Sequence, residues 1–162
     1  MTYKKIRLGI NGLGRIGRQI FRLASKDKDI EIVLINEKIP DIKNWIYTIS
    51  YDTIYGKYDE KLEYKNNKIF LNNKAISTSC KNKISEVPWG QHNVDYVVDC
   101  TGIKDNIIES RVILDRKEVK KIFISHSPED VDFTMVLGVN ENIYDHKKHN
   151  LIASSICDAT AI

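Results

Sequence analysis

Three glycines near the amino terminus have the spacing of a dinucleotide-binding turn. Gly12, Gly14 and Gly17 follow the pattern G-x-G-x-x-G. In this pattern the first glycine permits a sharp turn, the second lets the backbone approach a pyrophosphate, and the third lets a helix pack on a strand. The N–H groups at the start of that helix then face the phosphates. The pattern alone is equally compatible with an ordinary loop, so its surroundings must decide.

An acidic residue occurs at the distance that such a turn requires. The apolar stretch 30–35 predicts a second strand, and Glu37 follows it, twenty residues after Gly17. A carboxylate at the tip of the second strand can accept hydrogen bonds from the hydroxyls of an adenosine ribose. A 2′-phosphate would meet this negative charge, so the sequence favours NAD over NADP.

The elements around the turn and the acid are those of an open α/β sheet. Ile6, Leu8 and Ile10 predict a strand before the turn, and apolar residues at helical spacing follow it. The further predictions are a helix over 42–49, short antiparallel strands over 61–64, 68–71 and 74–77, a buried parallel strand over 95–102, a helix over 106–116, and strands over 121–125, 133–137 and 150–154. We therefore predict a doubly wound, mostly parallel Rossmann-type sheet with a small antiparallel insertion, in one domain over residues 1–162.

Composition restricts the classes of function. The 162 residues carry a net charge of +3, and short basic clusters such as 117–121 are typical of a solvated surface rather than of a nucleic-acid-binding stripe. We find no apolar run near the ~18 residues of a membrane span and no export signal. Three cysteines at irregular spacing, Cys80, Cys100 and Cys157, predict neither a disulfide framework nor a metal site. We expect a cytoplasmic protein without nucleic-acid or membrane partners.

Several motifs, in order, resemble those of the glyceraldehyde-3-phosphate dehydrogenase family. Residues 11–18 are similar to N-G-F-G-R-I-G-R, with Leu13 for its Phe, and residues 35–37 to I-N-D. The further matches are 51–56 with Y-D-S-x-x-G, 87–90 with I-P-W-G, 97–102 with V-V-E-S-T-G, 123–125 with I-I-S, and 138–140 with G-V-N. The resemblance spans nearly the whole chain and implies the NAD-binding half of such an enzyme.

The resemblance also implies which residues hold the cofactor. Arg15 and Ile16 would border the pyrophosphate, and Glu37 would hold the adenosine ribose. The complete implied set is Asn11, Gly12, Gly14, Arg15, Ile16, Gly17, Glu37, Thr101, Gly102 and Ser125. For the hydroxyls of Thr101 and Ser125 the alternative is capping of strand ends, a role that can coexist with cofactor binding.

By the same resemblance, Cys157 is the catalytic nucleophile. Exposed N–H groups and the dipole at a helix start stabilise a thiolate. The thiolate would attack an aldehyde to give a thiohemiacetal, hydride would leave for the nicotinamide, and phosphate would attack the remaining thioester. The alternative is a small buried apolar side chain, the usual fate of a lone cysteine, and this is what we expect of Cys80 and Cys100.

Three departures from the family limit what can be transferred. The segment 154–157 is one residue shorter than the family spacing, and Asp158 replaces a threonine that helps to hold phosphate. A carboxylate there would repel phosphate and disfavour the neighbouring thiolate, although an acid also suits the first turn of a helix. The sequence ends at Ile162, so we expect the second, catalytic domain with its histidine base to be absent. His126, after Ser125, is the only histidine expected beside the groove.

These observations lead to one expected function and two alternatives. We expect the NAD-binding domain of a phosphorylating aldehyde dehydrogenase, whose small aldehyde substrate is a phosphorylated triose and whose family implies a homotetramer. The chain alone is expected to bind NAD weakly and to be inactive. The alternatives are a non-catalytic nucleotide-binding or regulatory module, and a divergent paralogue that oxidises a different small aldehyde because of Asp158.

Overall fold

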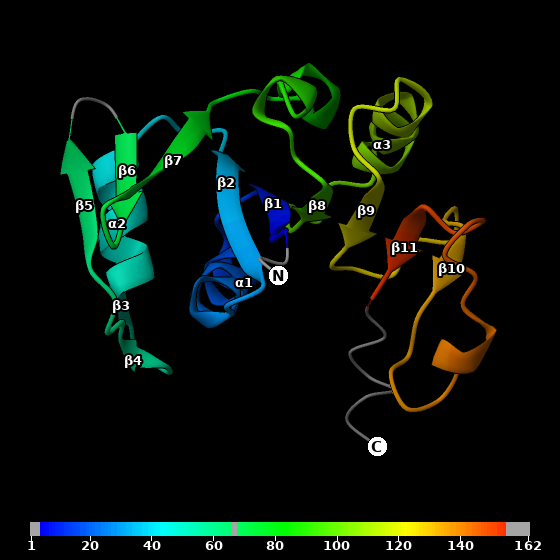
Figure 1. The fold of residues 1–162 in the computed structure, drawn as a ribbon, viewed down its shortest axis with the longest axis horizontal. Coiled ribbons are helices and arrows are strands. Elements are labelled where there is room, and N and C mark those ends of the chain that lie inside the picture. The colour runs from blue at the N-terminus through cyan, green and yellow to red at the C-terminus, as the bar shows by residue number, and fades with distance from the viewer. Residues whose placement is uncertain (1–3, 66–67, 155–162) are drawn as a thin grey trace.

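The protein is described by a computed structural model over residues 4–65 and 68–154, in which one long sheet crosses the molecule (Figure 1). The strands of this sheet are β1 Ile6–Asn11, β2 Ile30–Asn36, β5 Leu62–Lys65, β6 Lys68–Leu71, β7 Lys74–Ser79, β8 Tyr96–Asp99, β9 Lys121–Ile124, β10 Phe133–Thr134 and β11 Leu151–Ala153. Their spatial order is β10-β11-β9-β8-β1-β2-β7-β6-β5. A separate antiparallel pair joins β3, Tyr51–Asp52, to β4, Gly56–Lys57.

The central strands have the order of a dinucleotide-binding sheet. The run β7-β2-β1-β8-β9-β11 is parallel throughout, and β10 adds a further parallel strand at one edge. In this order the direction of winding reverses between β1 and β8, which is the topological switch point of the fold. At the other edge β6 and β5 pair antiparallel beyond β7. The predicted fold class, a mostly parallel doubly wound α/β sheet with a small antiparallel part, is confirmed.

Helices cover both faces of the sheet, and each face has its own core. On one face lie α1, Arg15–Lys26, and α2, Ile42–Ser50, which contribute Phe21 and Trp45 to the first core. On the other lies α3, Asn106–Asp115, with Ile113 in the second core. Strand side chains alternate between the two, since Val97 of β8 belongs to the α3 core and Val98 packs against the α1 core. Within residues 4–65 and 68–154 there are also three short 3-10 turns, η1 Ile84–Glu86, η2 Gly90–His92 and η3 Glu141–Ile143.

Two predicted strands are corrected by the structure. The strand expected over 74–77 continues to Ser79, and its last residues pair parallel with β2 while its first residues pair antiparallel with β6. The antiparallel insertion is therefore continuous with the main sheet. The strand expected over 133–137 ends at Thr134, because the Asn140 side chain donates to the Thr134 carbonyl and accepts from the Val136 N–H, which closes a turn.

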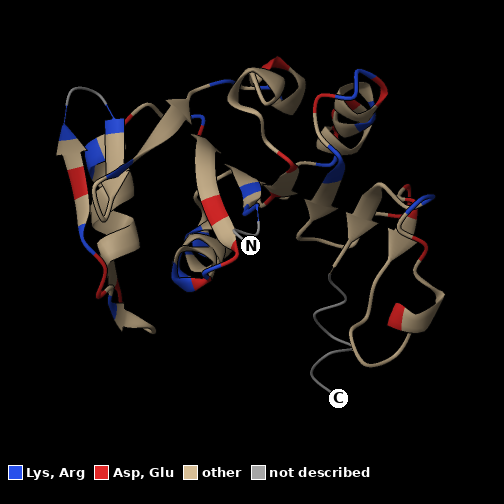
Figure 2. Cartoon of the chain, in the orientation of Figure 1, with Lys and Arg blue, Asp and Glu red and all other residues tan. Residues whose placement is uncertain are grey.

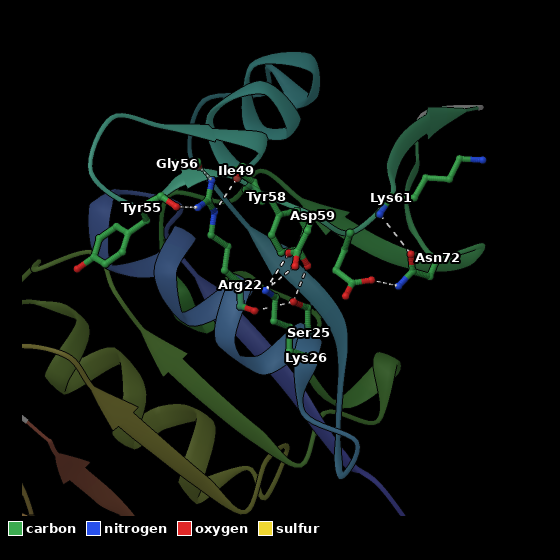
Figure 3. A network of polar contacts seen from close by, with 11 residues as sticks. Arg22, Ser25, Lys26, Ile49, Tyr55, Gly56, Tyr58, Asp59, Lys61 and Asn72 are labelled. Atoms are coloured by element: carbon green, nitrogen blue, oxygen red, sulfur yellow. Dashed lines mark hydrogen bonds and ion pairs between the residues drawn. The ribbon is translucent and has the colours of Figure 1, made fainter.

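A buried arginine ties the first helix to the second helix and to the β3-β4 pair. Arg22 of α1 is 8% exposed, and its guanidinium donates to the carbonyls of Ile49, at 2.8 Å, and of Gly56, at 2.9 Å (Figure 3). The same group lies 5.5 Å from the ring centroid of Tyr58, whose hydroxyl donates to Ser25. These contacts hold the segment between β2 and β7 against the helix that begins at the glycine turn.

Candidate functional site

The turn between β1 and α1 contains contacts that only glycine allows. Gly12 has a φ of +89°, and a Cβ there would lie 2.9 Å from the side chain of Thr101. A Cβ on Gly17 would lie 1.9 Å from the carbonyl oxygen of Gly12. A Cβ on Gly14, in contrast, would meet nothing within 4 Å. The first and third glycines therefore build the turn, and the second leaves open space beside it.

A pocket of about 250 Å³ lies at this turn. Its lining residues are Asn11, Gly12, Gly14, Asn36, Glu37, Lys38, Lys81, Asn82, Cys100, Thr101 and Ile103. They follow or end the strands β1, β2, β7 and β8, so the pocket spans the switch point at the carboxyl ends of the strands. Open α/β sheets bind their ligands at this position.

A second, wider depression of about 960 Å³ lies at the opposite ends of the central strands. Its lining includes Lys4, Asp95 and Lys120, which precede β1, β8 and β9, so it faces the amino ends of the strands. Lys120 and Asp95 form an ion pair there at 2.7 Å. Ligands of open α/β sheets bind at the carboxyl ends of the strands. The pocket at the β1-α1 turn is therefore the better candidate for a ligand site, although its volume is smaller.

The start of α1 faces the candidate pocket without a side-chain cap. Gly14 is the N-cap residue, and the N–H of Arg18 donates to its carbonyl at 3.1 Å. The N–H groups of the residues before Arg18 have no carbonyl partner within the helix. The first turn contains no acid, and Arg15 and Ile16 are exposed there. Free N–H groups and the helix dipole make this helix start suited to an anion.

Glu37 lines the same pocket as the helix start and already forms hydrogen bonds with the turn. One carboxylate oxygen accepts from the N–H of Leu13 at 2.8 Å, and the other accepts from the N–H of Ile39 at 3.4 Å. An ionised carboxylate has about four lone-pair positions, so capacity remains for hydroxyl groups of a ligand. Lys38 and Lys81 line the same pocket.

The predicted cofactor-binding residues divide into two groups. Those that line the pocket are Asn11, Gly12, Gly14, Glu37 and Thr101, and those that lie around it without lining it are Arg15, Ile16, Gly17, Gly102 and Ser125. The side chain of Asn11 is turned into the sheet, where it is 2% exposed and bonded to Asp99 and Asn36. Its amide is thus engaged by the protein itself.

Thr101 caps the end of a strand, which is the role expected as the alternative to cofactor binding. Its hydroxyl donates to Asp99 at 2.9 Å and accepts from the Ile103 N–H at 3.3 Å and from Asn106 at 2.8 Å. Ser125 follows β9, and its side chain forms a hydrogen bond with the Cys100 thiol. Both hydroxyls therefore hold strand ends in place.

Sequence reasoning missed part of the lining. Lys81 and Asn82 follow β7, and only the parallel pairing of β7 with β2 brings them to the pocket. Lys38, Cys100 and Ile103 were also missed, and each adjoins a residue that was predicted. Asn36 lies within the I-N-D match, and the signal that could have identified it is a polar residue at the end of an apolar strand.

The two cysteines that the structure describes are poor nucleophiles. Burial, and then the negative charge of Asp99, raise the pKa of the Cys100 thiol to about 12. The expectation of a buried side chain is wrong for Cys80, which is exposed because it follows the last residue of β7. Partial burial, and then the charge of Glu37, still raise the pKa of its thiol. Cys157 and Asp158 lie outside the described residues. Both ring nitrogens of His126 are buried, and neither has a hydrogen-bond partner in the described structure.

The described residues lack two other kinds of site. They contain no group of three or more His, Cys, Asp or Glu side chains arranged to hold a metal ion. None of their helices combines the length and the apolar character that a membrane crossing needs.

Comparisons with known proteins agree with this geometry. The family model described as glyceraldehyde 3-phosphate dehydrogenase, NAD binding domain, matches residues 6–107. Glyceraldehyde-3-phosphate dehydrogenase 2 of Streptomyces avermitilis is 37% identical over 97% of this chain and 47% of its own length. The enzymes of Priestia megaterium and Geobacillus stearothermophilus are 34% and 33% identical, each over 97% of this chain and 46% of their own length. The chain therefore spans about half the length of these curated relatives.

Proposed function

Because the chain belongs to the glyceraldehyde-3-phosphate dehydrogenase family, whose NAD-binding domain it carries, we propose that the pocket at the β1-α1 turn receives the adenosine and pyrophosphate of NAD. The observation that carries this proposal is that the uncapped start of α1 and the carboxylate of Glu37 line the same pocket, with open space beside Gly14. A helix start suits a diphosphate, and an acid at the end of β2 suits a ribose.

The chain's own residues fit such a cofactor. The N–H groups of Arg15 and Ile16 would donate to the pyrophosphate, and Glu37 would accept from the ribose hydroxyls while it still holds the N–H of Leu13. Thr101 and Ser125 would border the remainder of the dinucleotide at the ends of β8 and β9. When bound, NAD supplies the hydride acceptor of an oxidation.

We propose further that the chain acts as part of a longer, phosphorylating aldehyde dehydrogenase. The names of its relatives favour a triose phosphate as substrate, and the resemblance favours Cys157 as the nucleophile and a second domain that supplies the base. A homotetramer in the cytoplasm, without nucleic-acid or membrane partners, is part of the same proposal. The mixture of acidic and basic residues along the elements supports the exclusion of nucleic acid (Figure 2).

Calorimetric titration of the chain with NAD and with NADP tests the cofactor proposal. We expect heat of binding with NAD, weaker binding of NADP, and no NAD reduction when glyceraldehyde-3-phosphate and phosphate are added. Absence of any heat with NAD would contradict the cofactor site. Turnover by the chain alone would contradict the need for a second domain.

One sequence observation favours a second candidate. Asp158 replaces a residue that holds phosphate in the family, so a divergent enzyme could act on an unphosphorylated aldehyde. Steady-state kinetics of the longer protein with phosphorylated and unphosphorylated aldehydes separate the two, since the first candidate requires a preference for the phosphorylated substrate. A full-length protein that binds NAD and oxidises neither would instead be the non-catalytic module.

A further inference from the structure

A row of buried polar side chains runs beneath the pocket, across the ends of adjacent strands. Asn11, Asn36 and Asp99 are the last residues of β1, β2 and β8, and the sheet register aligns Asn11 with both of the others. Their exposed fractions are 2%, 4% and 0%. The next residue in the row is Ser79 of β7, two positions before Lys81. Three parallel strands thus end in a polar side chain at the same level.

The side-chain hydrogen bonds within this row run in one direction, from Asn36 through Asn11 to Asp99, while bonds in both directions join Asn36 to the backbone of Lys81. The N–H of Lys81 donates to Asn36 Oδ1 at 2.8 Å, and Asn36 Nδ2 donates to the Lys81 carbonyl at 3.0 Å and to Asn11 Oδ1 at 2.7 Å. Asn11 Nδ2 then donates to Asp99 Oδ1 at 2.8 Å. Each amide can face only one way, because its oxygen must meet a donor and its nitrogen an acceptor.

The direction of the chain of bonds depends on Asp99, since an ionised carboxylate only accepts. Asp99 also accepts from the hydroxyl of Thr101 at 2.9 Å and from Asn106 Nδ2 at 3.2 and 3.3 Å. These partners are neutral donors from β1, from the turn after β8 and from the first residue of α3. Buried polar groups of this kind depend strongly on every partner being present.

We propose that Asp99 is a positioning residue for the pocket. It does not line the pocket, but it holds Thr101 directly, and through Asn11 and Asn36 it holds the segment that contains Lys81. Thr101 and Lys81 lie at the two ends of the run β8-β1-β2-β7, so one carboxylate sets the distance between the two walls. The inference depends on the proposed function only for the identity of the ligand, NAD.

The variant Asp99→Asn tests this role. Asn11 and Thr101 both donate to Oδ1, and Asn106 also reaches Oδ2, so an amide turns its nitrogen either toward Asn11 and Thr101 together or toward Asn106. Either orientation sets two donors against each other. In the absence of any ligand we expect the amide hydrogen of Lys81 to exchange at least about tenfold faster, and we expect the Kd for NAD to rise about tenfold or more. A loss of global stability alone would also speed the exchange of amide hydrogens in β6. We expect the variant to leave those amide hydrogens as protected as in the wild type.

A double variant provides the rescue. Asp99→Asn with Asn11→Asp moves the acceptor-only group one strand along, so the nitrogen of the new amide donates to residue 11 and its oxygen accepts from Asn106. The second carboxylate oxygen at residue 11 accepts from Asn36, so both donors that face residue 11 meet an acceptor, although the bond between residues 11 and 99 now runs in the opposite direction. We expect the protection of the Lys81 amide and most of the NAD affinity to return. Failure of the double variant to restore either would contradict the proposal.

The matched control is Asp132→Asn, the same substitution at a carboxylate that accepts from the N–H groups of Asn150 and Leu151, away from the pocket. It should lower the stability of the protein, but it should change neither the exchange rate of the Lys81 amide hydrogen nor the Kd for NAD. If this control speeds the exchange of the Lys81 amide hydrogen as much as Asp99→Asn does, the proposed role of Asp99 is wrong. If Asp99→Asn does not fold, Asn11→Ala removes the link between Asp99 and Asn36 and leaves the direct partner of Lys81 in place, and unchanged exchange at Lys81 in that variant would likewise reject the proposal. If the wild type does not bind NAD but Asp99→Asn still speeds exchange at Lys81, the proposed function is wrong and the positioning role of Asp99 stands.

Discussion

The carboxylate of Glu37 accepts a hydrogen bond of 2.8 Å from the backbone N–H of Leu13, which lies 24 residues earlier inside the glycine turn. This contact joins the end of β2 to the turn that follows β1, and the two strands pair side by side. The acid therefore fixes the turn before any ligand arrives. Under the proposed function it has a second task, which is to accept from the ribose of NAD.

The variant Glu37→Gln should separate these two tasks. Its amide oxygen can still accept from Leu13, so we expect a folded protein, but the charge and part of the accepting capacity are lost. Because hydrogen bonds to charged groups contribute roughly 1.5–3 kcal/mol, the Kd for NAD should rise about tenfold or more. Discrimination against NADP should weaken, since the 2′-phosphate no longer meets a carboxylate. Parallel titrations with both dinucleotides measure this.

The control for that experiment is Glu31→Gln on the same strand. Glu31 pairs with Arg7 at 3.3 Å on the surface and does not line the pocket, so its replacement should change neither affinity. A Glu37→Gln protein that binds NAD as the wild type does, and still rejects NADP, would rule out the ribose contact.

Two glycine substitutions should have opposite effects on stability and binding. Gly17→Ala puts a Cβ 1.9 Å from the Gly12 carbonyl oxygen, so the helix must shift although alanine is the better helix former. Such overpacking costs about 1–3 kcal/mol or more, and the thermal midpoint should fall. Gly14→Ala meets no neighbour, so the midpoint should stay while NAD affinity drops, because the methyl group occupies the space left for the ligand. Calorimetry on both variants checks the pair, and equal midpoints would refute the tight packing at Gly17.

The first strand-helix-strand unit could be predicted because its signals are local. An apolar strand, the glycine spacing, helical periodicity and an acid all lie within residues 6–37. The buried run before Thr101 was equally clear from its composition. An acid as the last residue of that run, Asp99, was the available signal of a buried polar contact, and only the structure identifies its partners, Asn11 and Asn106.

The place of β7 could not be predicted, because its pairing is not local. Residues 74–77 alternate in polarity as a hairpin partner of β6 does, and nothing in that alternation indicates that residues 77–79 also pair with β2. This second pairing carries Lys81 and Asn82 to the pocket. One wall of the site was therefore missed, although the opposite wall, at Thr101, was anticipated.

Thiol labelling should rank the cysteines by their environment. Burial and the charge of Asp99 raise the pKa of Cys100 to about 12, so its thiolate is scarce near neutral pH and iodoacetamide should leave it unmodified in the folded protein. Cys80 is exposed, and we expect slow but measurable labelling there. If Cys157 is an activated nucleophile, it should react faster than either. Peptide mapping after short exposure to the reagent measures all three sites, and labelling of Cys100 ahead of Cys80 would contradict its burial.

Stability at low pH should depend on Asp132. Burial alone would raise the pKa of this carboxyl, but hydrogen bonds from the Leu151 N–H, the Arg111 guanidinium and the Asn150 N–H outweigh it, so the pKa is lowered. A carboxyl whose pKa is lower in the folded state stabilises the protein above its unfolded pKa, near 3.9, and that contribution is lost as the pH falls through the folded value.

The expected outcome for Asp132→Asn follows from this sign. At pH 7 the variant should unfold more easily by about 1–3 kcal/mol, because the N–H groups of Asn150 and Leu151 and the Arg111 guanidinium lose a charged acceptor. Below about pH 4 the wild type loses the same contribution, so the two denaturation curves should converge. Urea unfolding at a series of pH values measures the difference. A gap that stays constant from pH 7 to pH 2.5 would show that the charge of Asp132 contributes nothing, and that the variant acts through shape alone.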